Sequence, residues 1–316
     1  MSTKENPAFR PIRLDLAPDD LSEAALRRAF GFLPPAPFRA VLDVFARHAR
    51  GERDRFGWLV YDVLGLKLAA PSQRYGNTPP ELFIFAATGV DGTHVGFLDR
   101  APELGRDDLP VAGFAPWADG VVEIAASVFE AVGWLAGHDH VATRSDLAAA
   151  SPLAVADRDA VRDDLRRLGV PVGQAAAGGH GLDGAQDRWL LLPAEDGVGA
   201  WGPQVAHNDA TRYPRRGADS AVIVDAAEAM VAAGAPLDAL VMLKQVFVER
   251  WSDDTQDLVP LYGAFATVYG ALGRGSLVSN LPPLEARPAR PAELDDVELV
   301  SLVPSIRLAG LPEIAA

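Results

Sequence analysis

The apolar residues between positions 20 and 50 recur at helical spacing. "DDLSEAALRRAF" begins with acidic residues and places Leu26 and Phe30 four positions apart. "LPPAPFRAVLDVFARHAR" begins with prolines, and its apolar stripe consists of Phe38, Val41, Leu42 and Phe45. Prolines at a helix start and apolar residues on one stripe predict two helices. The next apolar run, "FGWLVYDVLGLKL", is short and predicts a strand.

Strand signals dominate residues 75–99, "YGNTPPELFIFAATGVDGTHVGFLD". The asparagine and the two prolines end any preceding helix, and "ELFIFAA" is rich in aromatic and β-branched residues. Asp91 and Gly92 form a dipeptide typical of tight hairpin turns, and "HVGFLD" alternates as a returning strand does. We therefore expect a β-hairpin that turns at Asp91 and Gly92.

A third strand and a helix complete this part of the chain. "LPVAGFAPW" predicts the strand, and in "VVEIAASVFEAVGWLAG" one helical face carries Ile124, Val128, Val132 and Leu135. The first residues of that stretch could finish a strand before the helix begins. Gly137 stands where a helix commonly ends. Two helices, several strands and a helix that packs back predict an α+β domain over residues 20–140.

Residues 141–217 form a poorly defined extension. "RDAVRDDLRRLG" predicts a short helix that turns Val161, Leu165 and Leu168 inward. "GQAAAGGHGLDGAQD" is rich in glycine and alanine and predicts a surface loop. "RWLLLP" either adds a strand to the first sheet or begins a second unit.

From residue 218 to residue 281 the pattern changes to helices separated by tight turns. Gly234 and Gly273 stand at matching turn positions, and this helix-turn-helix pattern resembles tetratricopeptide units. We expect three antiparallel helices around a shared core. Their apolar stripes contain Val222, Met230, Leu240, Phe247, Leu261 and Tyr269. Residues 282–316 are expected to be a proline-rich linker and tail, in which "DDVELVSLV" predicts an edge strand.

Charge and composition narrow the choice of partner. The 316-residue chain has 43 acidic and 29 basic residues and a net charge of −14. Such a field repels nucleic-acid phosphates and anionic lipids, so we expect no nucleic-acid or membrane partner and favour a basic protein. The sequence has no cysteine, which excludes disulfides, thiolate metal sites and cysteine nucleophiles. Without a signal-peptide core or a run of eighteen apolar residues, a cytoplasmic protein is expected. The abundance of alanine, glycine, proline and arginine is typical of a GC-rich bacterial genome.

Gly179, Gly181 and Gly184 match the G-x-G-x-x-G pattern of dinucleotide sites. Such a site needs a buried strand before the first glycine and a helix that opens at the last. The flanking "VGQAAA" and "AQDRWLLLP" have neither pattern. We therefore interpret the motif as a flexible loop and expect no cofactor.

His138 and His140 form an H-x-H pair. Metal hydrolases use such pairs where both imidazoles lie on one face of a strand and reach one ion. Here the pair follows a glycine that ends a helix, in a polar segment, so a solvated loop is favoured. The alternative is a metal-dependent hydrolase in which Asp139 and Asp146 complete the ligands.

The hairpin region supplies a candidate contact patch. His94 could act as a general base, but an exposed histidine at a sheet edge is favoured. Asp91 is explained by turn chemistry. Trp117 falls in the turn "APWADG", where an exposed aromatic side chain suits protein recognition. Together with Tyr75, these residues form the predicted protein-binding patch.

The order of these motifs resembles the SUKH superfamily over residues 20–140. The family has "LP" before a helix, a strand that leads into a glycine-rich turn, a following strand that ends in aspartate, and a terminal strand–helix unit. Here Leu33–Pro34, residues 89–92, Asp99 and residues 126–130 occupy those places in order. The resemblance implies an α+β fold with a mixed sheet flanked by helices. It also implies non-catalytic protein binding, most often as an immunity protein that neutralises a bacterial toxin, or in fungi as a cell-wall regulatory scaffold.

The expected function is therefore protein binding without catalysis. The acidic excess agrees with a basic partner such as a nuclease toxin. Two alternatives stay open beside it. One is the metal-dependent hydrolase that uses His138 and His140, and the other is a small-ligand regulatory protein with a pocket between the sheet and the helical region.

Overall fold

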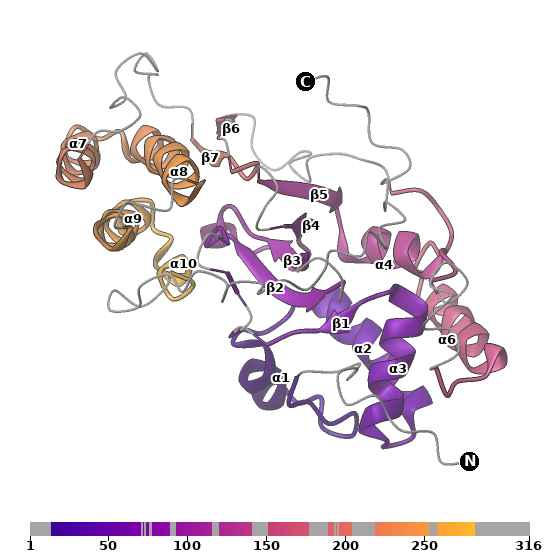
Figure 1. Ribbon diagram of the computed structural model, residues 1–316. Coiled ribbons are helices and arrows are strands. Elements are labelled where there is room, and N and C mark those ends of the chain that lie inside the picture. Colours follow the sequence, from indigo (N-terminus) through magenta and orange to yellow (C-terminus); the bar gives the residue numbers. More distant parts are fainter. Residues whose placement is uncertain are drawn as a thin grey trace.

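The structure, a computed structural model, describes residues 14–70, 72, 74–75, 78–88, 93–115, 120–140, 151–176, 189–192, 194, 196–203, 219–252 and 258–281. It has an α+β fold, in which helices pack on a five-stranded antiparallel sheet and a second helical unit lies beside it (Figure 1). The elements are α1 (Glu23–Phe30), α2 (Ala36–Ala49), α3 (Arg53–Leu64), β1 (Lys67–Leu68), β2 (Leu82–Ala87), β3 (His94–Leu98), the 3-10 helix η2 (Pro102–Leu104), β4 (Val111–Phe114), β5 (Val121–Ala125), α4 (Val128–Ala136), α6 (Val155–Arg167), β6 (Trp189–Leu192), β7 (Ala200–Pro203), α7 (Ser220–Ala232), α8 (Pro236–Ser252), α9 (Val259–Ala271) and α10 (Gly275–Val278).

The two helices expected before residue 50 are confirmed as α1 and α2. The hydroxyl of Ser22 accepts a hydrogen bond from the backbone nitrogen of Ala25 and caps α1, and Gly31 ends this helix in the left-handed region. Prolines begin α2, and its expected apolar stripe is buried.

The strand expected over "FGWLVYDVLGLKL" is wrong for most of that stretch, which belongs to helix α3. α3 packs against α2, α4, α6 and β1, so residues on almost all of its sides are buried. A continuous apolar run does not distinguish such a helix from a buried strand. Gly65, with φ 69°, ends α3, and only Lys67 and Leu68 pair as the strand β1.

The strands pair in the order β1-β2-β3-β4-β5. β2 and β3 pair antiparallel from Leu82 opposite Leu98 to Ala87 opposite His94, which confirms the hairpin. Its expected turn at Asp91 and Gly92 lies outside the described residues. The described strands of this sheet pair only antiparallel, so the expectation of a mixed sheet is corrected. Each strand pairs with the strand that follows it in the chain, and the described connections between them contain no α-helix of the kind that usually makes a parallel crossover.

The main core lies between one face of the sheet and α1–α4. The rings of Phe85 and Phe97 stack with their centroids 4.4 Å apart, and the ring of Phe38 lies 4.6 Å from the first and 5.1 Å from the second. α6 packs against α2 and α3 and adds Val161 and Leu165 to this core. The core therefore extends beyond the domain end expected near residue 140.

Residues 219–281 contain α7–α10 and form a second core, which we call the helical unit. α7, α8 and α9 pack on one another, and the stripe residues Leu240, Phe247, Leu261 and Tyr269 are buried as expected. β6 and β7 form a separate two-stranded sheet, so "RWLLLP" does not extend the first sheet. No helix in the described part of the chain is long and apolar enough to cross a membrane.

One stripe residue of the helical unit departs from its expected place. Val222 is 54% exposed, so its assignment to the shared core is wrong. α7 lies at the outside of the helical unit (Figure 1), and its fully buried residues are Ile223 and Ala227.

Candidate functional site

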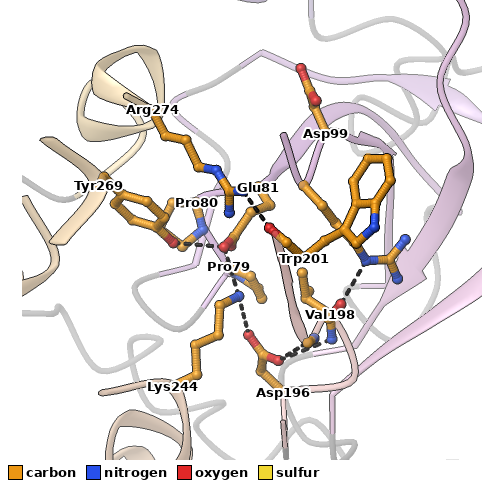
Figure 2. Close-up of polar contacts among 12 residues, drawn as sticks. Pro79, Pro80, Glu81, Asp99, Asp196, Val198, Trp201, Lys244, Tyr269 and Arg274 are labelled. Atoms are coloured by element: carbon orange, nitrogen blue, oxygen red, sulfur yellow. Dashed lines mark hydrogen bonds and ion pairs between the residues drawn. The ribbon is translucent and has the colours of Figure 1, made fainter. Parts of the chain in front are cut away.

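A buried ionic joint connects the helical unit to the sheet (Figure 2). Glu81 directly precedes β2, and its backbone oxygen accepts a hydrogen bond from the nitrogen of Asp99 over 2.9 Å. Its carboxylate Oε1 lies 2.7 Å from Nζ of Lys244 on α8 and accepts a 2.8 Å hydrogen bond from the hydroxyl of Tyr269 on α9. We call Glu81, Lys244, Tyr269 and Asp196 the ionic joint.

Asp196 supplies the second carboxylate of the joint. Its Oδ2 accepts a 2.8 Å hydrogen bond from Nζ of Lys244. Its Oδ1 accepts hydrogen bonds from the backbone nitrogens of Val198 at 3.0 Å and Gly199 at 3.2 Å, which fixes the turn before β7. Its backbone oxygen accepts a 2.8 Å bond from the nitrogen of Val121. Asp196 therefore links the sheet, the β7 segment and the helical unit.

A second cation, Arg74, lies near the joint. Its guanidinium donates to the backbone oxygens of Thr78 and Pro79, each over 3.0 Å, and to that of Leu82. Burial lowers the pKa of Arg74 to about 10 although the charge of Glu81 opposes this shift, so the side chain stays charged at neutral pH. Arg74 and Lys244 together balance the charges of the two carboxylates in the joint.

Tyr269 serves as a hydrogen-bond donor in the joint. Burial, followed by the negative charge of Glu81, raises the pKa of the Tyr269 hydroxyl well above its ordinary value. The hydroxyl therefore keeps its proton and donates a hydrogen bond to the Glu81 carboxylate.

Further polar contacts extend the joint toward α10. Nε of Arg274 donates to both carboxylate oxygens of Glu103, at 2.9 and 3.2 Å, and its Nη2 donates to the backbone oxygen of Trp201. Nδ2 of Asn280 donates to the backbone oxygen of Pro80 over 2.8 Å. The segment that precedes β2 thus holds the helical unit at both α8 and the end of α10.

The burial of the joint decides what it can do chemically. The side chains of Glu81 and Lys244 are 1% and 2% exposed and contact each other directly. A carboxylate and an ammonium are suitable for acid–base chemistry only where a substrate can reach them. The joint is therefore a structural connection, because the Lys244 ammonium lies buried between the two carboxylates.

Two members of the predicted protein-binding patch lie together. The rings of Tyr75 and His94 stack with centroids 4.6 Å apart and planes at 17°. His94 is 4% exposed and lies on β3, between β2 and β4, so the expectation of an exposed histidine at a sheet edge is wrong. Asp91 and Trp117 lie outside the described residues.

The environment of His94 also affects its protonation. Burial, followed by the positive charge of Arg74, lowers the pKa of His94 to about 4, so the imidazole is neutral at neutral pH. Its Nδ1 has no hydrogen-bond partner among the described residues. The half-buried Tyr75 hydroxyl has a raised pKa, also because of burial. With 4% exposure, His94 offers almost no surface to a protein partner or a substrate.

His138 and His140 both contact backbone oxygens at the end of α4. Nδ1 of His138 lies 2.7 Å from the oxygen of Trp134, and Nε2 of His140 lies 2.8 Å from the oxygen of Leu135. Their ring centroids are 5.9 Å apart. Within the described part of the chain, no group of three or more His, Cys, Asp or Glu residues could hold a metal ion. Asp146 and the G-x-G-x-x-G glycines lie outside the described residues.

Sequence reasoning missed the ionic joint, although one signal for it is present. Lys244 is the one basic residue in the apolar stretch "LDALVMLKQVFV" of α8. A lysine surrounded by core positions must be paired, because an isolated buried ammonium is too costly. The sequence does not reveal that its partners, Glu81 and Asp196, come from distant segments.

Comparisons with known proteins add no assignment. No protein-family model matches the chain, and a search of curated proteins finds no significant match.

Proposed function

We propose that the protein works by binding another protein, a basic one, and carries out no bond-making chemistry of its own. The form of this function that the SUKH resemblance implies is an immunity protein that neutralises a bacterial toxin. The net charge of −14 accelerates association with a basic protein and disfavours nucleic acid.

The single observation that carries the proposal is the internal use of the buried ionisable groups. Glu81, Asp196, Lys244 and Arg274 contact one another or other groups of this chain and hold the sheet and helical unit together. An enzyme needs such groups in contact with substrate. Where they serve the fold instead, a rigid scaffold that presents a surface is the better explanation.

The predicted protein-binding patch exposes less surface than the sequence suggests. His94 is buried and Tyr75 is half-buried, so the surface of the hairpin available to a partner depends on other residues. Asp91 and Trp117 stay predicted contact residues.

Neutralisation of a toxin tests the proposal. The genes that flank this one are expressed singly, and each product that arrests growth is then co-expressed with this protein. We expect one such product to be basic, growth to be restored, and the two proteins to form a stoichiometric complex. Its association rate should fall as ionic strength rises, because salt screens the attraction.

A different result would favour the hydrolase alternative. Purified protein that contains stoichiometric zinc, and hydrolyses a substrate until a chelator is added, would contradict the binding function. Replacing His138 and His140 by glutamine should then abolish both the zinc content and the activity.

A further inference from the structure

The outward surface of α7 has an unusual composition for an exposed helix. All residues of α7 except Ser220, Asp225 and Glu228 are alanine, valine, isoleucine or methionine. A helix at the outside of a protein normally carries charged and polar residues on the side away from the core. α7 instead has apolar residues on both sides.

The exposed residues of α7 form one continuous face. At 3.6 residues per turn they fall within an arc of about 120°. We call this surface the α7 outer face, and it consists of Ala221, Val222, Asp225, Glu228, Ala229 and Ala232. The core side of the helix carries Ile223 and Ala227. The α7 outer face is thus separate from the residues that pack on α8 and α9.

Val222 is the residue that helix propensity does not explain. Alanine favours helices wherever it stands, so the exposed alanines alone indicate little. Valine loses side-chain freedom in a helix, and at 54% exposure Val222 gains little from burial in return. A single exposed valine is ordinary, but on a face that it shares with exposed alanines Val222 is suited to burial against a second molecule.

The charge of the helical unit indicates the chemistry of that molecule. Among its described side chains, the basic residues are Lys244 and Arg274, and both point inward and are at most 2% exposed. The exposed charged residues of the same part are Asp219, Asp225 and Glu228, all acidic. The surface of the helical unit is therefore acidic around a small apolar strip.

We infer that the α7 outer face is a docking surface for a basic segment of a partner protein, with an aliphatic side chain that covers Val222 and arginine or lysine side chains that pair with Asp225 and Glu228. This inference rests on the proposed protein-binding function and assigns it a second surface, away from the hairpin. The alanines leave a flat surface on which the partner's backbone lies close. A second copy of this chain is disfavoured, because two α7 outer faces in contact would oppose their own carboxylates.

Photo-crosslinking tests the surface in cells that make the protein. A benzoylphenylalanine is placed at position 222 and, as a matched control, at position 155, where Val155 on α6 is 61% exposed. We expect a discrete adduct with a basic protein from position 222 and none from position 155. The crosslinked peptide should contain arginine or lysine.

Charge-matched variants then separate local contact from the overall field. Asp225→Asn with Glu228→Gln removes two acidic groups from the α7 outer face, and Asp43→Asn with Glu52→Gln removes two exposed acidic groups from α2 and the start of α3. With the captured protein purified, the first pair and Val222→Gln should each weaken binding at least tenfold. The second pair and Val155→Gln should change it less than twofold. Equal thermal midpoints would show that all variants are folded.

The outcomes distinguish this inference from the proposed function. If a toxin or other basic protein binds but all four variants bind it alike, the α7 surface is wrong while the protein-binding function stands. An adduct at position 222 with a second copy of the chain, or with another part of the same chain, also overturns the surface. If no protein is bound at all, the proposed function fails, and the docking surface fails with it.

Discussion

Nζ of Lys244 on α8 lies 2.7 Å from Oε1 of Glu81, the residue before β2. The ammonium lies equally near a second carboxylate, because Asp196 accepts its other contact at 2.8 Å. Both contacts are buried, so their contribution to stability depends on the ammonium and both carboxylates being present. The sheet and the helical unit should therefore unfold together rather than as independent modules.

Lys244→Met is expected to destabilise the protein severely. The methionine fills a similar volume, but the carboxylates of Glu81 and Asp196 are left buried without their shared cation. Breaking a buried ion pair from one side costs about 3–5 kcal/mol. Chemical denaturation should show this loss as a lower free energy of unfolding.

A double variant provides the control for Lys244→Met. Asp196→Asn, added to Lys244→Met, removes one carboxylate, keeps an oxygen that accepts hydrogen bonds, and leaves the charge of Glu81 balanced by Arg74. The double variant should be more stable than Lys244→Met alone, because a neutral group is cheaper to bury than an unpaired charge. A double variant that is less stable than the single one would show that an unpaired charge is not the cause of the loss in Lys244→Met.

Tyr269→Phe removes one hydrogen-bond donor from Glu81 and leaves the ring in place. The hydroxyl is fully buried and donates to a charged carboxylate, so we expect a loss of about 1.5–3 kcal/mol. Equilibrium unfolding measures it. Tyr75→Phe is a ring-matched comparison whose cost should be smaller, because the Tyr75 side chain is only half-buried. Equal costs would contradict a special role for Tyr269.

The helices and strands were largely predictable because their signals are local. The stripe of Phe38, Val41, Leu42 and Phe45 has helical spacing, and the aromatic run "ELFIFAA", which contains the first strand of the hairpin, has strand composition. α3 was not predictable in this way, because burial on almost all sides removes the periodicity. Val222 shows the reverse error, since an apolar residue at helical spacing can face outward.

The ionic joint could not be derived from local signals. Glu81, Asp196 and Lys244 belong to three distant segments, and their contacts depend on how the helical unit docks on the sheet. The burial of His94 also depends on a contact between separate segments. Its place after a turn suggested exposure, but β4 pairs with β3 and buries it in the middle of the sheet.

Gly197→Ala is expected to destabilise the protein, because the turn that contains Asp196 and Gly197 lies directly against the backbone of β5. Gly197 has φ 70°, and a Cβ there would overlap the backbone oxygen of Val121 and lie 2.7 Å from its nitrogen. Gly51→Ala is the matched control, with φ 81° and open space around the added carbon. The control should cost about 1–2 kcal/mol for the left-handed backbone. Gly197→Ala should cost at least about 1–3 kcal/mol more, as steric overlap does in a packed interior. Thermal or urea unfolding of both variants measures the difference, and similar losses would show that the turn moves freely away from β5.

His94 should make stability depend on pH in the mildly acidic range. Its folded pKa, about 4, lies below the ordinary value of 6.5, because burial and Arg74 disfavour the charged imidazole. As pH falls below 6.5, the unfolded chain takes up a proton that the folded protein does not, so the free energy of unfolding decreases until the folded pKa is reached. Between pH 7 and pH 5 this effect amounts to about 1–2 kcal/mol. His94→Phe keeps an aromatic ring against Tyr75 and removes the titrating group, so the variant should lose less stability than the wild-type protein over that interval. Urea denaturation at the two pH values checks this, and parallel losses in both proteins would show that His94 is free to take up a proton in the folded state.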